Sequence, residues 1–278
     1  MLKRVITAAI GLPLVILIVH HGGWPLLLMC LLVSLVGLRE LYRAFFKADK
    51  PIYIVGYILA VGYFFAAFVF GVGYWLLIAV ALLIIVVQTG LVLFFPRLTL
   101  EDVAITVYGF LYVPFMFSFI MLVREHPFGQ YFVWLIFTSA FGCDTFAYLV
   151  GVTIGRHKLV NTPSPKKSVE GLIGGILGAA LVGFVYGFFV VRFHEPEVEH
   201  FILIATLISL FGAAFSIIGD MSASAIKRHT KIKDFGDLLP GHGGVVDRAD
   251  SVIFVAPFVY SAMIILFLIT GQPWVYGL

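Results

Sequence analysis

Long apolar blocks separated by short polar joints run along almost the whole chain. Their lengths approach the ~20 residues that a helix needs to cross the hydrocarbon core of a bilayer. The candidate helices cover residues 5–20, 24–38, 52–70, 74–95, 104–123, 131–150, 170–191, 201–221 and 250–270. The pattern predicts an all-α, polytopic integral membrane protein with about nine transmembrane helices. The first two candidates are short, and Pro13 lies in the first, so we expect a tilt or a helical hairpin there.

The positive charges are strongly biased to one side of this predicted topology. Of the 18 Lys and Arg residues, all but Arg124 and Arg192 fall in the N-terminal segment or in the connections 2–3, 4–5, 6–7 and 8–9. Because cytoplasmic loops carry the excess of Lys and Arg, we expect a cytoplasmic N-terminus and a location in the inner (cytoplasmic) membrane. The apolar run after Lys3 and Arg4 is followed by no small-x-small cleavage site, so we interpret it as a retained first helix.

The overall composition argues against a soluble protein but says little about function. Charged residues make up only 12% of the chain and the formal net charge is +3, so the balance gives no indication of a nucleic-acid partner. Cys30 and Cys143 both lie in apolar segments, which favours buried free thiols over a disulfide framework. The places where the few charges gather are therefore more informative than their sum.

One polar window near the end of the chain concentrates ionisable groups beside apolar sequence. Asp220, Ser224, Lys227 and Arg228 have the spacing i, i+4, i+7, i+8, which places them on one stripe of a helix. A snorkelling basic helix end would explain the cations, but it does not explain Asp220 at the end of a long apolar run. Charged groups within membrane segments are expensive and usually functional.

A pair of carboxylates lies at the start of the last predicted helix. Asp247 and Asp250 are three positions apart, so they share a helix face; the helix dipole alone would favour carboxylates there. Asp144 is a further acid with apolar sequence on both sides. Converging carboxylates beside a basic cluster suit Mg²⁺, a hard cation that takes oxygen ligands and shares substrate phosphates. We therefore expect Asp144, Asp220, Asp247 and Asp250 to be the metal ligands, with proton carrier as the alternative role of Asp144.

Glycines and cations in the same regions suit phosphate groups. Gly243 and Gly244 precede the last helix, where backbone N–H groups at a helix N-terminus can bind phosphate, although a glycine run alone is weak evidence. His242 lies between the basic cluster and the aspartates, and its role as phosphate ligand or proton carrier is left open. A second basic segment precedes the seventh predicted helix, with hydroxyls and lysines that an ordinary positive-inside loop would also contain: Ser164, Lys166, Lys167 and Ser168.

These residues resemble the phosphatidate cytidylyltransferase, or CDP-diacylglycerol synthase, family. The family pattern is Ser-x-x-Lys-Arg, Lys-Asp, a small residue, Pro-x-His-Gly-Gly and Asp-Arg-x-Asp. The chain matches it with Ser224, Lys227, Arg228, Lys233, Asp234, Gly236, Pro240, His242, Gly243, Gly244, Asp247, Arg248 and Asp250. Ala249 departs from the larger residue usual in the family. The upstream Ser-Pro-Lys-Lys-Ser-x-Glu-Gly and the sequence around Asp144 also look like this family, so the motifs cover about residues 130–260.

The resemblance implies a membrane enzyme of phospholipid biosynthesis, a nucleotidyltransferase that converts CTP and phosphatidic acid into CDP-diacylglycerol and pyrophosphate. It implies Mg²⁺ and a second cation, with K⁺ as the candidate. The catalytic group is expected to comprise Lys227, Arg228, His242, Asp247 and Asp250. The phosphate-binding group is expected to comprise Ser164, Lys166, Lys167, Ser168, Ser224, Gly243, Gly244 and Arg248. Residues 126–278 would form the catalytic region, with a polar pocket facing the cytoplasm, and residues 1–125 a scaffold, a homodimer interface or a lipid-facing surface.

Three alternatives remain at this point. A CTP-dependent polyprenol kinase would use similar metal chemistry but release CDP, and the long contiguous match argues against it. A transporter would explain intramembrane Asp144 and Asp220, but we see no inverted repeat, and the acids gather near one membrane face. A CDP-alcohol phosphotransferase is disfavoured because its Asp-Gly-x-x-Ala-Arg motif is absent from the chain.

Overall fold

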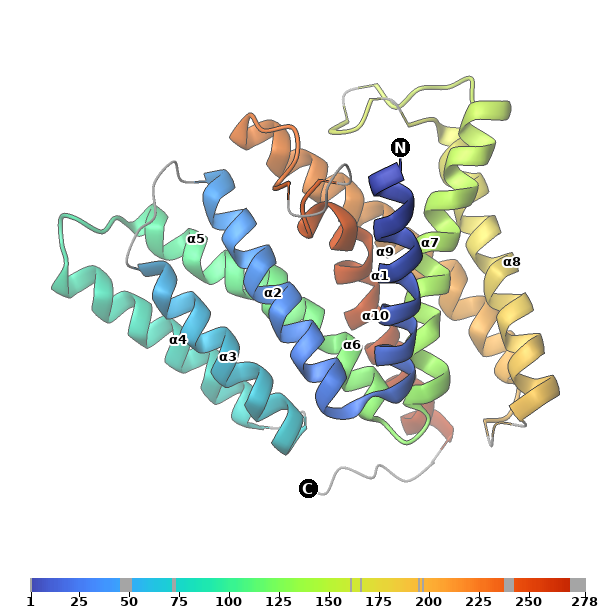
Figure 1. The fold of residues 1–278 in the computed structure, drawn as a ribbon, viewed down its shortest axis with the longest axis horizontal. Helices are drawn as coiled ribbons and strands as arrows, with labels where there is room; N and C mark the ends of the chain where they lie inside the picture. Colours follow the sequence, from blue (N-terminus) through green and yellow to red (C-terminus); the bar gives the residue numbers. More distant parts are fainter. Residues whose placement is uncertain are drawn as a thin grey trace. The chain divides into compact units, whose positions relative to one another are not determined.

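The computed structural model describes residues 2–45, 52–71, 74–160, 162–165, 167–194, 196, 198–237 and 243–270. Throughout these ranges the regular structure is helical, and it contains no β-strand beyond an isolated bridge. The helices are α1 (Leu2–His21), α2 (Gly23–Phe45), α3 (Ile52–Phe70), α4 (Tyr74–Leu93), α5 (Leu100–Phe110), η1 (Leu111–Phe115), α6 (Met116–Glu125), α7 (Gly129–Thr153), α8 (Val169–His194), α9 (Phe201–Thr230) and α10 (Val246–Thr270). Figure 1 shows them along the chain. The predicted all-α membrane class is confirmed.

Fewer of the described helices are long enough to span a membrane than the apolar pattern predicts. In the described part of the chain, seven helices are long and apolar enough to span a bilayer. The stretches Gly11–His21 and Ile78–Leu93 are apolar but shorter. The predicted count of about nine and the cytoplasmic N-terminus therefore stay predictions.

Two helices continue well beyond the apolar segments that predicted them. α2 continues to Phe45, past Arg39 and Arg43, and α9 continues to Thr230. Asp220, Lys227 and Arg228 consequently belong to one uninterrupted helix, as their spacing predicted.

The chain forms two compact units, and the first comprises residues 1–125 and 230–248. Tyr42 of α2 lies at the centre of its packing: the side chain is buried, and its hydroxyl donates to the Thr106 carbonyl at 3.2 Å. Gly56 of α3 and Gly109 of α5 leave room for the Tyr42 ring, since a Cβ atom at either position would overlap it. These glycines therefore allow three helices to approach around one aromatic side chain.

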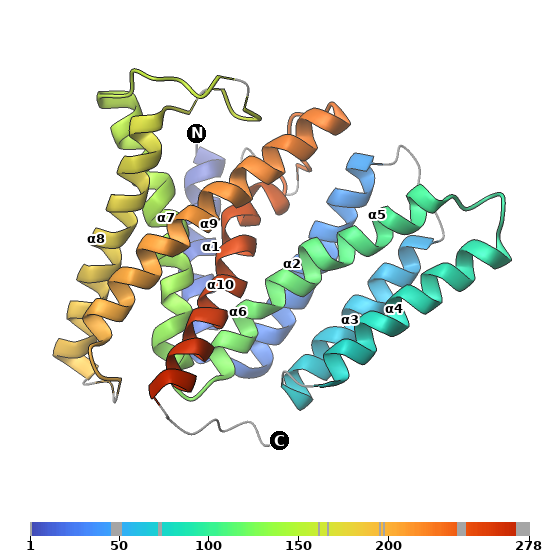
Figure 2. The ribbon, with the colours of Figure 1, turned by 180° about the vertical axis from the view of Figure 1, so that it is seen from behind.

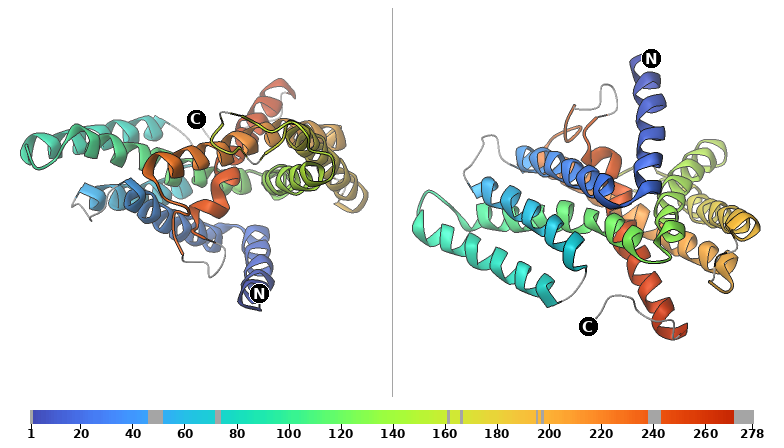
Figure 3. Two further views of the ribbon diagram at one scale, coloured as in Figure 1. Left: turned by 90° about the horizontal axis from the view of Figure 1, so that it is seen from above. Right: turned by 60° about the horizontal axis from the view of Figure 1, so that its bottom comes forward.

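The first unit also contains a sharp turn between α1 and α2, visible in Figure 3 as a change of direction in the dark blue ribbon. Gly22 and Gly23 have φ angles of 71° and 58°, which residues with side chains rarely adopt. Arg124 at the end of α6 donates to the carbonyls of Val19, at 3.0 Å, and His20, at 2.6 Å. These bonds satisfy carbonyls that the last turn of α1 would otherwise leave unpaired.

A π-helical turn, η1, joins α5 and α6 into one long rod. Pro114 lies inside this turn and has no N–H group to donate, so the regular helical ladder cannot pass through it unchanged. Thr99 caps the start of the rod: its side chain accepts from Asp102 N, and the Asp102 side chain accepts from Thr99 N.

The second unit comprises residues 126–229 and 249–278. α7 and α8 lie side by side in Figures 1 and 2, and glycines of α8 face α7. A Cβ atom at Gly175 would lie 2.9 Å from the Cys143 carbonyl oxygen, and one at Gly178 would overlap the Phe146 ring. Small residues that let helix backbones approach closely are the usual basis of helix packing in membranes. Cys143, Ala179 and Ala213 continue this packing from α7 and α8 to α9.

Cys30 and Cys143 are both buried free thiols, which confirms their expected state. The segment 230–248 belongs to the first unit, although the sequence placed it in a single region from 126 to 278. Whether catalysis belongs to that region stays a prediction.

Candidate functional site

Three of the predicted carboxylates gather in the second unit, each from a different helix. Asp144 lies on α7, Asp220 on α9 and Asp250 on α10, and the three interact electrostatically with one another. Asp144 is exposed, Asp220 is half-buried and Asp250 is 8% exposed. The cluster therefore extends from a buried helix face to the surface.

Gly219 explains how α9 and α10 approach each other beside this cluster. A Cβ atom at Gly219 would overlap the Asp250 carbonyl and lie 3.1 Å from the Phe254 ring. Asp220 is the next residue, so the close contact brings its helix turn directly beside the one that contains Asp250. The sequence motifs contain both aspartates but not this glycine.

Ser251, which the sequence analysis did not select, connects members of the cluster. Its hydroxyl lies 3.5 Å from Asp144 Oδ2 and 3.4 Å from the Ser216 carbonyl oxygen, and its backbone N–H donates to Asp250 Oδ1 at 2.8 Å. Its position next to Asp250 was the only signal in the sequence. Ser251 therefore contacts Asp144 through its hydroxyl and Asp250 through its backbone N–H.

Two cations tie the loop before α8 to α9. The Lys167 ammonium forms an ion pair with Asp220 Oδ2, and both side chains are about one-quarter exposed, at 26% and 29%. Arg228 Nε donates to the Pro163 carbonyl. Lys227 adds an electrostatic interaction with Asp250. The predicted basic segment thus meets the predicted carboxylates in this unit.

The loop that carries Lys167 is folded back on itself. Leu159 N donates to the Lys167 carbonyl at 3.0 Å, and Val169 N donates to the His157 carbonyl at 2.9 Å. Ser168 is 3% exposed, and its hydroxyl accepts from Gly171 N at 3.2 Å, so in this structure it acts as a helix cap. Ser164 is half-buried, and its carbonyl accepts from Lys167 N.

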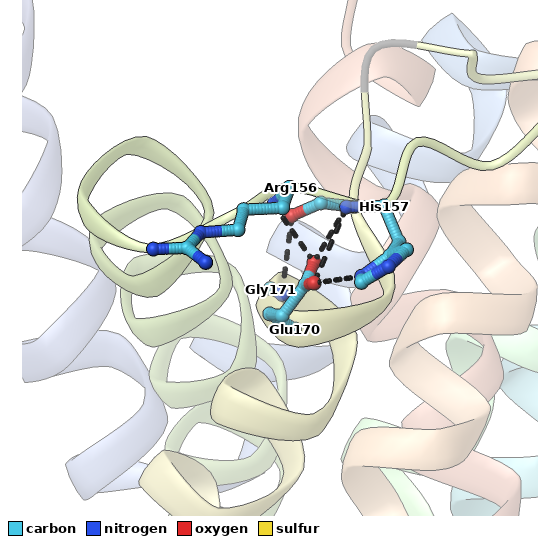
Figure 4. A network of polar contacts seen from close by, with 5 residues as sticks. Arg156, His157, Glu170 and Gly171 are labelled. Atoms are coloured by element: carbon cyan, nitrogen blue, oxygen red, sulfur yellow. Dashed lines mark hydrogen bonds and ion pairs between the residues drawn. The ribbon is translucent and has the colours of Figure 1, made fainter.

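Glu170 fastens the other side of this loop, as Figure 4 shows. Its carboxylate accepts from Arg156 N at 3.1 Å and from His157 N at 3.2 Å, and it also pairs with His157 Nδ1. The acid of the predicted Ser-Pro-Lys-Lys-Ser-x-Glu-Gly segment therefore has a bonding role that its sequence position did not reveal.

Asp247 lies in the first unit, in the first turn of α10. Its Oδ2 accepts from Phe235 N at 2.8 Å and from Gly244 N at 3.0 Å. Gly243 has φ +82°, so it supplies a backbone conformation that favours glycine. The Gly244 N–H group, which the sequence assigned to phosphate, already donates to a carboxylate in this structure.

Glu40 of α2 is a further acid that the sequence analysis missed. It is 7% exposed, and its two oxygens accept from Val245 N at 2.9 Å and from Val246 N at 3.0 Å. It precedes these donors by 205 and 206 residues, and no motif contains it. Its only signal in the sequence was that it is an acid beside Arg39 and Arg43, just after the predicted helix 24–38.

The remaining predicted residues are placed as follows. Ser224 is half-buried on α9, and Arg248 is exposed on α10. Lys166, Pro240, Gly241 and His242 lie outside the described residues. Asp247 and Asp250 belong to one helix, three positions apart, as predicted.

The cluster around Asp144, Asp220 and Asp250 suits a hard divalent cation by donor type, because its ligands would all be carboxylate oxygens that repel one another without a counter-charge. Within the described ranges, no three His, Cys, Asp or Glu side chains already surround a metal position. The Lys167 ammonium supplies positive charge to Asp220 there. The donors therefore fit such an ion in chemistry, and closing around it requires rearrangement of side chains.

Comparison with known proteins gives consistent matches over nearly the whole chain. Residues 2–266 match the model of the cytidylyltransferase family. A phosphatidate cytidylyltransferase from Staphylococcus haemolyticus is 31% identical over 268 residues, covering 94% of this chain and 98% of the relative. Phosphatidate cytidylyltransferases from Staphylococcus aureus and Staphylococcus epidermidis are each 32% identical with the same coverage.

Proposed function

We propose that this chain, which belongs to the cytidylyltransferase family, transfers CMP from CTP to phosphatidic acid and releases pyrophosphate and CDP-diacylglycerol. As a member of this family, the chain is a nucleotidyltransferase of lipid metabolism. The observation that supports the proposal most directly is the gathering of Asp144, Asp220 and Asp250 with Lys167 from four separate segments.

The proposed reaction is a phosphoryl-type substitution. A phosphate oxygen of phosphatidic acid bonds to the α-phosphorus of CTP, and the bond from that phosphorus to the bridging oxygen of the β-phosphate breaks. The electron pair leaves with pyrophosphate. The phosphate nucleophile is already ionised near neutral pH, so the reaction requires charge neutralisation and positioning rather than a strong base.

In the second unit, cations would neutralise the phosphates and carboxylates would hold the metal. We assign Lys167, Lys227 and Arg228 to phosphate binding or to stabilisation of the leaving pyrophosphate. Ser164, Lys166, Ser168 and Ser224 remain proposed phosphate ligands, although Ser168 also caps α8. An ion pair such as Lys167–Asp220 can open when a phosphate competes for the lysine and a metal for the carboxylate.

We propose Mg²⁺ as the metal, with Asp144, Asp220 and Asp250 as its ligands. When bound, Mg²⁺ supplies Lewis-acid polarisation and charge neutralisation for the phosphates. Ser251 would keep the Asp144 and Asp250 carboxylates oriented. A second, monovalent cation such as K⁺ remains a proposal that rests on the family resemblance alone.

For the first unit, we propose that Asp247 contributes to metal binding and that Arg248, Gly243 and Gly244 contribute to phosphate binding. Asp247 Oδ2 accepts two backbone bonds, so the carboxylate that would bind the metal is also held by the chain. His242 remains a proposed phosphate ligand or proton carrier outside the described residues.

The cellular setting follows from the apolar helices and the charge bias. The chain is a membrane protein with several apolar helices. We propose that it lies in the inner membrane with its active site facing the cytoplasm, where CTP is available, and that the acyl chains of the lipid remain in the bilayer. A homodimer through the first helices is a further proposal.

A transfer assay with labelled nucleotide tests the proposed function. Purified protein in detergent receives phosphatidic acid, Mg²⁺ and CTP labelled at the α-phosphate. We expect the label in the lipid phase, and with γ-labelled CTP we expect it in aqueous pyrophosphate. If the α-label stays aqueous as CDP while a lipid alcohol is phosphorylated, the protein is a kinase. An absence of transfer to either acceptor would contradict the proposal.

Variants in the second unit test the proposed metal and phosphate roles. Asp220→Asn should lower turnover by about 100-fold or more, because it removes both a metal ligand and the partner of Lys167. Lys167→Ala should raise the apparent KM for CTP or lipid. Glu199→Gln removes an exposed carboxylate in the same unit and should leave both constants unchanged. Equal kinetics in Asp220→Asn and Glu199→Gln would contradict the assigned roles.

A further inference from the structure

We propose that Glu40 is a positioning residue for the nucleotidyl transfer, because its carboxylate accepts from the backbone where α10 begins and packs against Gly236. This inference rests on the proposed function, since the residues that it positions are Asp247 and Arg248. Glu40 does not belong to the sequence motif, and it lies on α2, far from that motif along the chain.

The first argument is the bonding of the Glu40 carboxylate. Oε1 accepts from Val245 N at 2.9 Å and Oε2 from Val246 N at 3.0 Å. Val245 immediately precedes α10 and Val246 is its first residue, where N–H groups have no partner within the helix. A carboxylate at a helix N-terminus is also favoured by the helix dipole. Since Glu40 is 7% exposed, water cannot easily replace it.

The second argument concerns two glycines of the motif. A Cβ atom at Gly236 would overlap Glu40 Oε1, and one at Gly244 would crowd Oε2 and the Gly236 nitrogen. The two backbones therefore approach each other with the Glu40 carboxylate against both. Glycine at these two positions has a physical reason: any side chain would occupy the space of that carboxylate.

The third argument is the link from Glu40 to Asp247. Gly244 N–H donates to Asp247, while the next two N–H groups donate to Glu40. Phe235 N–H, one residue before Gly236, also donates to Asp247. Two carboxylates thus accept four backbone bonds, three of them from the consecutive residues 244–246. Loss of Glu40 would leave Val245 and Val246 without these acceptors at the point where the chain enters the turn with Asp247 and Arg248.

The test uses graded variants of Glu40 with a matched control. Glu40→Gln keeps the size but replaces one acceptor oxygen by a donor, and Glu40→Ala removes both acceptors. We expect kcat/KM to fall by about 10-fold in Glu40→Gln and about 100-fold in Glu40→Ala, since small displacements of reacting groups have effects of this size. Glu101→Gln removes an exposed carboxylate of the same unit and should match the wild type.

Two readouts distinguish positioning from a contribution to folding alone. A purely structural role would reduce the active fraction and leave the KM for CTP unchanged, whereas positioning predicts a raised KM for CTP in the folded fraction. Hydrogen exchange of the peptide 243–248 should be faster in both Glu40 variants and unchanged in Glu101→Gln. A Glu40→Ala protein with wild-type KM and wild-type exchange would overturn the inference while the proposed function stands.

Glycine variants provide an independent check that does not alter Glu40. Gly244→Ala should reproduce the exchange and KM changes of Glu40→Gln, because its methyl group displaces the carboxylate. Gly62→Ala is the matched control, since a Cβ atom at Gly62 has no neighbour within 4 Å. Failure of the wild type to transfer CMP would refute the proposed function, but the exchange measurements would still decide whether Glu40 anchors the segment.

Discussion

At the scale of single residues, the carboxylates differ in the kind of partner that they bind. Glu40 and Asp247 accept from backbone N–H groups, whereas Asp220 pairs with the side chain of Lys167. A backbone partner fixes the path of the chain, while a side-chain partner can be exchanged for a ligand. Asp247 is proposed both to accept from the backbone and to bind a ligand.

Two variants of Asp247 should separate these roles. Asp247→Asn keeps an oxygen that can accept from Phe235 and Gly244, so the protein should fold, but loss of the charge should lower turnover by about 100-fold or more. Asp247→Ala should in addition raise hydrogen exchange across residues 235 to 248. Near-normal turnover in Asp247→Asn would exclude the metal role.

The sequence could predict Asp144, Asp220 and Asp250 because charged residues beside long apolar runs are conspicuous. It could not predict Ser251 or Glu40 as part of the arrangement. Both act through bonds to residues that are distant in the chain or on a neighbouring helix, and neither has a distinctive spacing. Pairings of that kind depend on helix packing, which hydropathy does not contain.

At the scale of helices, the apolar pattern predicted where helices occur but not how they approach. The π-helical turn around Pro114 and the extension of α9 to Thr230 depend on local bonding rather than on hydropathy. The glycines of α8 are another example of packing that the hydropathy pattern does not predict. Their number was visible in the sequence, but the facing atoms of α7 were not.

Gly178→Val tests the close packing of α7 and α8. The added side chain would overlap Phe146, and overpacking of this kind typically destabilises a protein by about 1–3 kcal/mol. We expect a lower midpoint of thermal unfolding in detergent. Gly62→Val, at a position with open space, should leave the midpoint nearly unchanged. Equal midpoints of Gly178→Val and Gly62→Val would mean that the contact of Gly178 with Phe146 does not contribute to stability.

At the scale of the whole molecule, the charge bias predicts which loops face the cytoplasm. The two native thiols are buried, so an added cysteine can be labelled selectively. Asp234→Cys should react with a membrane-impermeant maleimide only after cells are opened, whereas Glu199→Cys should react in intact cells. The opposite pattern would reverse the predicted orientation, and labelling of both in intact cells would refute the helix count between them.

The bonds of Glu40 can form only after its distant donors have been synthesised. Its donors follow it by 205 and 206 residues, so α2 is synthesised long before Val245 and Val246 exist. Throughout that interval the Glu40 carboxylate of α2 lacks the Val245 and Val246 N–H groups that it binds in the folded protein. The packing of α2 in the first unit is therefore completed only when the start of α10 has been synthesised.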